Sequence, residues 1–236
     1  MKKNISIIIP TLNEEKFIGE TIRFLRRHGN AQLFEIIVVD GGSSDNTINF
    51  AKNEGAVVLS SPQKGRALQM NLGAQHSQQE ILYFMHADTI PPETYIADII
   101  NALSNGVKMG CFRYKFDSPR LILRFNAFFT RFSFLFCQGG DKTFFISRDI
   151  FFEMGGYDSE HIIMEEYDFL RRAKRSGYEL AVLPCTCTVS ARKYENNSWI
   201  RVQIANLVVY NLWVWSMAKP QKLQFLYKYL LGGSAR

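Results

Sequence analysis

Three apolar runs of the chain each end in polar side chains that could do chemistry. The first run is followed by Thr11 and Glu14, the second by Asp40, and another by His86 and Asp88. An aspartate can accept hydrogen bonds from a base or a ribose, and carboxylate oxygens are ligands that Mg²⁺ and Mn²⁺ prefer. These residue types predict a site for a nucleotide and a divalent cation.

Positive charge for a diphosphate is available nearby. Lys64 and Arg66 flank a glycine just before a predicted helix, where a phosphate can be bound. The two glycine-rich patterns of common nucleotide enzymes are missing, because neither Gly-x-Gly-x-x-Gly nor a P-loop follows the first run. The sequence therefore disfavours two enzyme classes, the dinucleotide oxidoreductases and the P-loop enzymes.

The elements that must position these side chains form a repeated strand–helix pattern. Continuous apolar runs at residues 5–9, 35–39, 56–60 and 81–85 suit parallel strands that are buried on both faces. In open α/β sheets, ligands bind beyond the carboxyl ends of the strands. We therefore expect an open, mostly parallel α/β sheet, flanked by helices, that gathers the polar groups on one rim.

Each group also has a purely structural interpretation. Thr11 or Asn13 could cap a helix, Asp40 with two glycines could form a tight turn, and Asp88 could begin the loop before two prolines. A cap does not need an acid as the last residue of a strand, however, and Asp40 and Asp88 both hold that place. Convergence on one rim favours a binding site.

The second half of the chain has a different pattern. Residues 110–116 alternate like a half-exposed strand, and residues 164–178 predict a helix with acids in its first turn and bases in its last. A long helical pattern begins at residue 195. We expect a domain at 1–194, with a nucleotide-binding half at 1–104 and an acceptor half at 105–194, and a C-terminal extension of amphipathic helices at 195–236.

Composition narrows the protein class. The chain has 236 residues and is 47% hydrophobic, which suits one sizeable domain. Four scattered cysteines are too few for a disulfide framework and lack the pairing of a zinc site. The apolar start is too short for a secretory signal, and no run of 18 or more apolar residues occurs. A cytoplasmic setting is the expectation.

The formal net charge of +6 has several interpretations. Nucleic acid, anionic lipid and phosphate-bearing substrates could each explain the late basic residues, although the acidic rim disfavours nucleic acid. Residues 120–136 and 204–222 combine aromatic with basic side chains, as surfaces in a lipid headgroup region do. They predict peripheral contact with an anionic membrane, at its inner face. The alternative is that they are core helices.

Four ordered motifs resemble a known family. "SIIIPTLNEEKFIGETI", "IIVVDGGSSDNTINFA", "KGRALQMNLGA" and "YFMHADT" are similar to motifs of the nucleotide-sugar-dependent glycosyltransferases of family 2, which have the GT-A fold. The resemblance covers about residues 5–192. It is strongest to short bacterial members with His-Ala-Asp in place of Asp-x-Asp.

The resemblance implies a role for each matching residue at the donor site. Asp88 would bind the metal, Mn²⁺ or Mg²⁺, and His86 would contact ribose or metal or be structural. Asp40 would contact the base, usually uracil. The remaining nucleotide-binding positions would be Pro10, Thr11, Leu12, Glu14, Lys64 and Arg66.

The resemblance also implies a catalytic base and an acceptor side. Relatives commonly carry Glu-Asp at the start of a helix, and here Glu166 falls on the base position, with Glu165 as the second candidate and Asp168 as a distant third. The structural alternative is that these acids stabilise a helix N-terminus. Asp141, in a Gly-Gly-Asp-Lys segment from residue 139, Arg192 and Trp199 would lie near the acceptor or the diphosphate.

The resulting prediction is an inverting, metal-assisted glycosyltransferase. It would move a sugar from a nucleotide-sugar, expected to be a UDP-sugar, to a carbohydrate or lipid-linked acceptor. Two alternatives stay open, a nucleotidyltransferase and a non-catalytic relative that binds a nucleotide. The absence of a glycine-rich loop after the first strand weighs against the nucleotidyltransferase.

Overall fold

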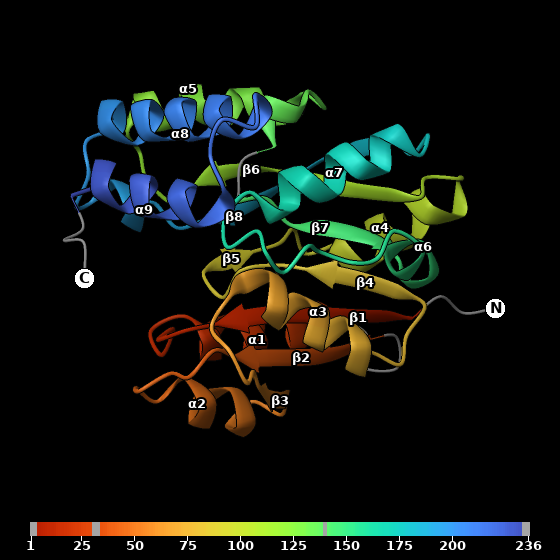
Figure 1. Cartoon of the computed structure of the whole chain (residues 1–236). Coiled ribbons are helices and arrows are strands. Elements are labelled where there is room, and N and C mark those ends of the chain that lie inside the picture. The colour runs from red at the N-terminus through yellow and green to blue at the C-terminus, as the bar shows by residue number, and fades with distance from the viewer. Residues whose placement is uncertain (1–3, 30–33, 139–140, 233–236) are drawn as a thin grey trace.

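One sheet organises the part of the chain that the computed structural model describes, residues 4–29, 34–138 and 141–232. Eight strands in these residues pair in the order β3-β2-β1-β4-β7-β6-β8-β5 (Figure 1). Helices cover the sheet, as the sequence predicted.

The first half of the sheet is parallel. β1 (Ile5–Thr11) lies between β2 (Phe34–Asp40) and β4 (Ile81–Phe84), and β3 (Val57–Ser60) is at the edge. The four strand predictions are therefore confirmed, and the ends of β1, β2 and β4 do share one rim. The helices of this half are α1 (Ile18–His28), α2 (Thr47–Asn53), α3 (Arg66–His76) and α4 (Tyr95–Ser104).

The second half of the sheet is mixed. β7 (Phe144–Ser147) runs antiparallel to β4 and to β6 (Met109–Phe116), whereas β8 (Leu180–Val189) is parallel to β6. The two-residue strand β5 (Thr89–Ile90) pairs antiparallel with the end of β8. The other helices are α5 (Leu121–Phe128), α6 (Arg148–Glu153), α7 (Glu165–Arg175), α8 (Trp199–Val214) and α9 (Pro220–Leu230), with 3₁₀ turns η1 (Phe129–Arg131), η2 (Leu135–Cys137) and η3 (Arg192–Tyr194).

Strand β1 shows why its sequence is a continuous apolar run. Ile7 and Ile9 face one hydrophobic cluster, which includes Ile22 of α1. Ile8 faces the opposite cluster, which includes Met70 of α3. Because successive side chains of a strand point to opposite faces, a strand covered on both sides is mostly apolar. The one fully buried polar side chain among residues 5–9, Ser6, is hydrogen-bonded to Glu35 and Ser77.

The close approach of α3 to the sheet depends on Gly73. A Cβ atom there would lie 2.5 Å from Ile8 Cγ2 and 3.1 Å from Val39 Cγ2. We expect Gly73→Ala to lower the free energy of unfolding by about 1–3 kcal/mol, because the methyl group forces the core apart. Thermal unfolding would show a melting temperature roughly 2–10 °C below that of the wild type.

A second helical glycine provides the matched control. A Cβ atom at Gly19 of α1 would lie 3.5 Å from the flexible end of Arg23 and 3.9 Å from Phe50 Cβ, which are ordinary van der Waals distances. Gly19→Ala should leave the melting temperature unchanged or raise it, since Ala favours a helix over Gly by about 0.5–1 kcal/mol. Equal melting temperatures for the two variants would contradict the packing argument.

The C-terminal helices lie against the second half of the sheet. In Figure 1, α5, α8 and α9 gather at the end of the molecule away from α2 and β3. Val202 of α8 is part of the main core, and Leu223 of α9 packs with Val209 and Trp213 of α8. Among the described residues, no helix has the length and apolar character needed to cross a membrane. The division at residue 194 stays a prediction.

Candidate functional site

The rim at the ends of β1 and β2 is a tightly bonded turn. Asp40 is 1% exposed, and its carboxylate accepts hydrogen bonds from the backbone N–H groups of Gly42 and Ser43, both at 2.8 Å. The hydroxyl groups of Ser43 and Thr11 also donate to it, at 2.5 and 3.3 Å. Asp40 therefore holds the turn, and the predicted contact with a base would have to replace one of the hydroxyl donors.

A buried glutamine, which the sequence did not single out, fixes the same rim. The Gln69 amide of α3 donates to the Thr11 carbonyl at 2.9 Å and to the Val39 carbonyl at 2.7 Å. Of the predicted nucleotide residues here, Leu12 and Lys64 are exposed and Pro10 is half-buried. The structure gives these three positions no contact that tests their role.

A large cavity of about 890 Å³ lies between the turn after β4 and helix α8, and it is not lined by Thr11, Glu14 or Asp40. The seven sequence-predicted residues that line it are Arg66, His86, Asp88, Asp141, Glu166, Arg192 and Trp199. We call this cavity the chamber. Residues from five separate parts of the chain thus face one space, and the sequence connected Asp141, Glu166, Arg192 and Trp199 to the others only through a resemblance.

Asp88 and Arg192 form an ion pair at the edge of the chamber. Arg192 Nε lies 2.9 Å from Asp88 Oδ2, and the two other nitrogens of the guanidinium donate to the two Glu14 oxygens at 2.7 Å. Burial raises the pKa of Asp88 above its ordinary value, although Arg192 opposes the shift. A protein cation therefore bridges the carboxylates that the sequence assigned to the metal and nucleotide.

The two glutamates at the start of α7 have different surroundings. The Glu165 carboxylate is fully buried and accepts a charged hydrogen bond from Arg66. Glu166 lines the chamber, and the nearest Arg66 nitrogen is 3.8 Å from its carboxylate. Burial raises the pKa of Glu166 to about 7, against the effect of Arg66. Such a carboxyl can exchange a proton near neutral pH, which is what a general base needs.

Asp141 has a partner that the sequence analysis missed. Lys193 Nζ lies 3.2 Å from Asp141 Oδ1. Burial would raise the pKa of Asp141, but Lys193 and then His86 hold it below its ordinary value. Asp141 is therefore an ionised carboxylate on the chamber wall. Gly139 and Gly140, which precede it in the predicted segment, lie outside the described residues.

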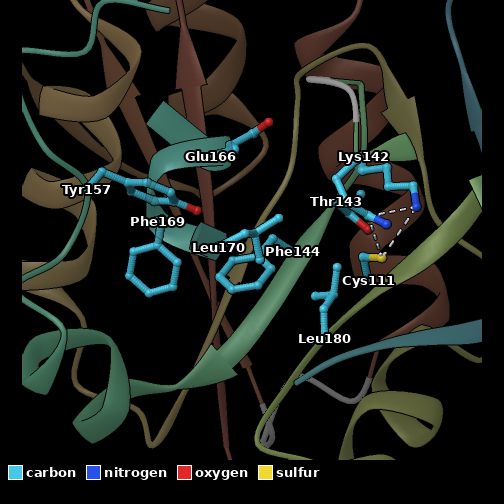
Figure 2. Close-up of a pocket in the computed structure, with 10 residues that line it drawn as sticks. Cys111, Lys142, Thr143, Phe144, Tyr157, Glu166, Phe169, Leu170 and Leu180 are labelled. Atoms are coloured by element: carbon cyan, nitrogen blue, oxygen red, sulfur yellow. Dashed lines mark hydrogen bonds between the residues drawn. The ribbon is translucent and has the colours of Figure 1, made fainter. Parts of the chain in front are cut away.

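A small cavity of about 20 Å³ lies behind Glu166 (Figure 2). That volume holds about one water molecule. The buried Lys142 borders it and donates to Gln138 Oε1 at 2.8 Å and to the Thr130 carbonyl at 2.7 Å. Burial lowers the pKa of Lys142. Lys142 Nζ also lies 3.8 Å from Cys111 Sγ, so the network joins Lys142 to β6 as well.

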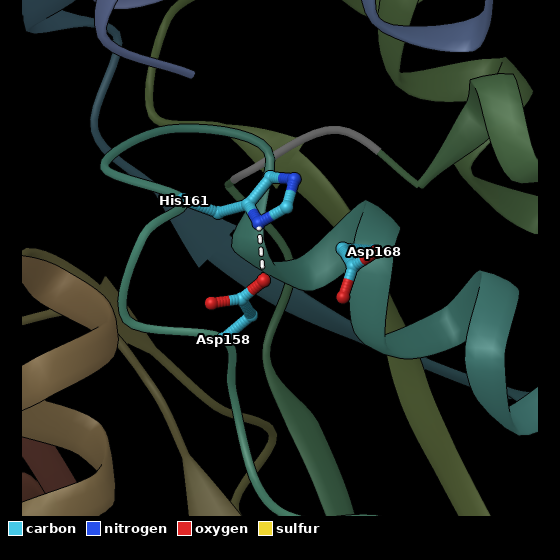
Figure 3. A group of neighbouring side chains, drawn as sticks. All are labelled: Asp158, His161 and Asp168. Atoms are coloured by element: carbon cyan, nitrogen blue, oxygen red, sulfur yellow. Dashed lines mark hydrogen bonds and ion pairs between the residues drawn. The ribbon is translucent and has the colours of Figure 1, made fainter. Parts of the chain in front are cut away.

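Asp158, His161 and Asp168 form a second acidic cluster (Figure 3). His161 Nδ1 lies 3.0 Å from Asp158 Oδ2. Both oxygens of Asp168 already face arginines, at 3.2 Å from Arg171 Nη2 and 2.7 Å from Arg172 Nε. Asp168 is therefore part of an ion-pair network that anchors α7, which agrees with its low rank as a candidate base.

The far wall of the chamber consists of residues that no motif indicated. Tyr114 of β6, Asn126 of α5 and Tyr167 of α7 contribute to it, with Gln203 and Tyr210 of α8. For Gln203 and Tyr210, the signal that could have found them was the aromatic and amide content of the helix that follows the last long strand. The wall mixes aromatic surface with hydrogen-bonding groups, as small-molecule binding sites commonly do.

Comparison with known proteins agrees with this geometry. A family model described as glycosyl transferase family 2 matches residues 6–195. A probable glycosyltransferase of Bacillus subtilis, YdaM, is 26% identical over 209 residues, which is 78% of this chain and 50% of that protein. This chain thus spans half the length of that relative.

Solved structures show the same fold. A mannosyltransferase from Pyrobaculum calidifontis, in complex with GDP-Man and Mn2+, has a TM-score of 0.71 at 18% identity, covering 98% of this chain and 69% of that one. Glucosyl-3-phosphoglycerate synthase from Mycobacterium tuberculosis, with Mn2+ and UDP, has a TM-score of 0.64 at 17% identity, covering 98% and 81%. Because the family model matches most of the length of this chain, the chain belongs to glycosyl transferase family 2.

Proposed function

We propose that the protein transfers a sugar from a nucleoside-diphosphate sugar to a hydroxyl acceptor, with inversion at the anomeric carbon. The observation that carries the proposal is that Asp88, Glu166 and Arg66 line one chamber. Glycosyl transfer needs a charge-neutralising group on the leaving side and a base on the attacking side. The two solved structures of similar fold hold GDP-Man or UDP, each with Mn2+, and we propose a UDP-sugar as the donor to test first.

The residues present fit a divalent cation. Asp88 supplies a hard oxygen ligand at the chamber edge, and Mg²⁺ or Mn²⁺ usually takes its other ligands from water and phosphate. The Arg192 guanidinium, which bridges Asp88 and Glu14, shows that this place stabilises positive charge. When bound, the cation would offset the charge of the diphosphate. Arg192 would then turn from the carboxylates to the diphosphate.

Glu166 is assigned the proton transfer. The acceptor oxygen forms a bond to the anomeric carbon as the bond to the diphosphate oxygen breaks, and the electron pair leaves with the diphosphate. The hydroxyl proton passes to the Glu166 carboxylate. Glu165 keeps Arg66 in place through its buried ion pair, and Arg66 faces the chamber with positive charge for the leaving group.

The acceptor and the setting are proposed at a coarser level. The mixed aromatic and amide wall supports a carbohydrate or a lipid-linked sugar as the acceptor. A cytoplasmic enzyme stays a prediction of the sequence.

A thermal-shift panel tests the donor proposal. The chain is heated with UDP, GDP, UDP-sugars or nucleoside triphosphates, each with and without Mn²⁺. We expect a nucleoside diphosphate or its sugar to stabilise the protein only with metal, by about 3 kcal/mol at a hundredfold excess over Kd. Stabilisation by a triphosphate alone would support the nucleotidyltransferase instead. Binding without any release of sugar or transfer would support the non-catalytic relative.

A further inference from the structure

One end of the molecule presents an apolar surface that the described residues leave uncovered. It comprises residues 120–136 and 199–231, which contain α5, η1, the first two residues of η2, α8 and α9, and we call it the platform. Sixteen of the twenty large hydrophobic side chains that are exposed among the described residues belong to it. The most exposed are Leu121 at 75%, Trp215 at 72% and Met217 at 72%. Such a concentration marks an interaction surface.

Helix α8 shows that this exposure is organised. Its buried residues Val202, Ala205, Val209 and Trp213 form one stripe that packs on the protein. Ile200, Ile204, Leu207 and Val214 form a second, exposed stripe. At about 100° per residue the two stripes lie on opposite sides of the helix. A helix that is apolar on both sides needs a second apolar partner.

The charge of the platform indicates what that partner is. Its seven charged side chains are all cationic and all exposed, and it contains no aspartate or glutamate. Among the described residues none of the seven forms an ion pair with an acid. They are Arg120, Arg124, Arg131, Arg201, Lys219, Lys222 and Lys228. A second copy of this chain would bring cations against cations, whereas anionic headgroups complement them.

The platform is continuous with the chamber. Phe125, Phe129, Phe136 and Leu207 are exposed on the platform and also line the chamber that holds Asp88. A surface seated on this side would therefore face the opening of the chamber.

We propose that the platform docks onto an anionic lipid bilayer, with its apolar side chains in the headgroup region and its cations on the phosphates. Aromatic and aliphatic side chains flanked by Lys and Arg bind bilayers in this way without crossing them. The chamber then opens towards the membrane, where a lipid-borne acceptor could enter it. Docking does not depend on the proposed function.

Vesicle co-sedimentation tests the proposal. The protein should bind vesicles that contain phosphatidylglycerol. It should dissociate from them in about 0.5 M KCl, because salt screens the charges. It should not bind vesicles of phosphatidylcholine alone. Each surface cation contributes about fivefold to the partition coefficient. Removing three platform cations should therefore weaken binding by about 10²-fold, in the variant Arg124→Gln/Lys222→Gln/Lys228→Gln.

A matched control removes the same charge elsewhere. Three exposed lysines off the platform are replaced in Lys16→Gln/Lys52→Gln/Lys174→Gln, which should bind vesicles like the wild type. Equal weakening by both triple variants would overturn the proposal, because it would show that only net charge matters. Failure of the wild type to bind anionic vesicles would overturn it too.

An apolar variant and the oligomeric state complete the test. Leu121→Ser/Phe134→Ser/Trp215→Ser changes exposed side chains that lie outside the chamber, so it should fold and still show the metal-dependent nucleotide shift while losing vesicle binding. If light scattering shows a dimer that this variant dissociates, and the dimer ignores vesicles, a second copy covers the platform and the bilayer proposal is wrong. Nucleotide binding is measured in the absence of vesicles, so a failure of membrane docking can be distinguished from a failure of the donor proposal.

Discussion

Asp88→Ala is expected to lower the turnover of sugar transfer by about 10³-fold. Asp88 faces the chamber from the turn between β4, which ends at Phe84, and β5, so the prediction that it is the last residue of a strand was wrong. Its proposed task is to hold the cation that neutralises the departing diphosphate. Because that charge develops in the transition state, the loss should fall mainly on kcat. The measurement is donor consumption and product formation at saturating metal.

The same variant should remain folded. Burial raises the pKa of Asp88, so the ionised side chain contributes little to stability, and Arg192 keeps its two hydrogen bonds to Glu14 after the change. The melting temperature without ligand is expected to stay within a few degrees of the wild type, while metal-dependent stabilisation by a nucleotide disappears. Asp158→Ala removes a carboxylate outside the chamber and serves as the control with full activity. Near-normal transfer by Asp88→Ala would refute the assigned role.

The position of Thr11 and Asp40 on one rim was predictable because both residues stand at strand ends. The runs before Thr11, Asp40 and Asp88 are short, continuous and apolar, so the sequence marks both the strand and the point at which its side chains leave the sheet. Parallel pairing of β1 with β2 and β4 then brings these ends together. The apolar runs in the sequence therefore predict both the strands and the rim at which their polar residues meet.

The partners of these residues were not predictable in the same way. Arg192 reaches Asp88 because β5, directly after Asp88, pairs with the end of β8, and the chain then turns at η3. A two-residue strand has no periodicity to recognise, and pairing between residues about a hundred positions apart leaves no local signal. The contact between Lys193 and Asp141 was not predicted either, because the two residues are 52 positions apart and no local pattern links them.

The role of Asp40 shows a limit of a different kind. A motif indicates that an aspartate is required at a position, but it does not distinguish a contact with ligand from a bond within the turn. The carboxylate accepts from Gly42, Ser43 and Thr11. The structural alternative that the sequence left open, a tight turn, is what the described residues show, and the base contact stays a prediction.

Glu166→Gln is expected to lower kcat/KM by about 10²–10⁴-fold, the usual contribution of a general base. For the wild type, the base works only when deprotonated, and the pKa of Glu166 is raised to about 7. The value of kcat/KM should therefore rise with pH and level off above about pH 7. In Glu166→Gln that rising limb should be absent, because an amide has no proton to lose in this range.

Two further variants separate the base from its neighbour. Glu166→Asp moves the carboxylate back by about one bond, so it should lose about 10²-fold but keep a rising pH limb. Glu165→Gln breaks a buried ion pair with Arg66, which should lower the melting temperature while the limb persists. If the rise of kcat/KM with pH is absent in Glu165→Gln but present in Glu166→Gln, the base is Glu165 and not Glu166.

Stability gives an independent check on the same carboxyl. Because the folded state raises the pKa of Glu166 from 4.5 to about 7, it binds a proton more tightly than the unfolded chain does. The free energy of unfolding therefore falls as pH rises through that window, by at most about 3 kcal/mol. Glutamine carries no such penalty, so Glu166→Gln should melt above the wild type at pH 8 and close to it at pH 5. If the difference in melting temperature between Glu166→Gln and the wild type is the same at pH 5 and pH 8, the pKa of Glu166 is not raised. A carboxyl with an ordinary pKa would be ionised at both pH values. It would then give no rise of kcat/KM near neutral pH.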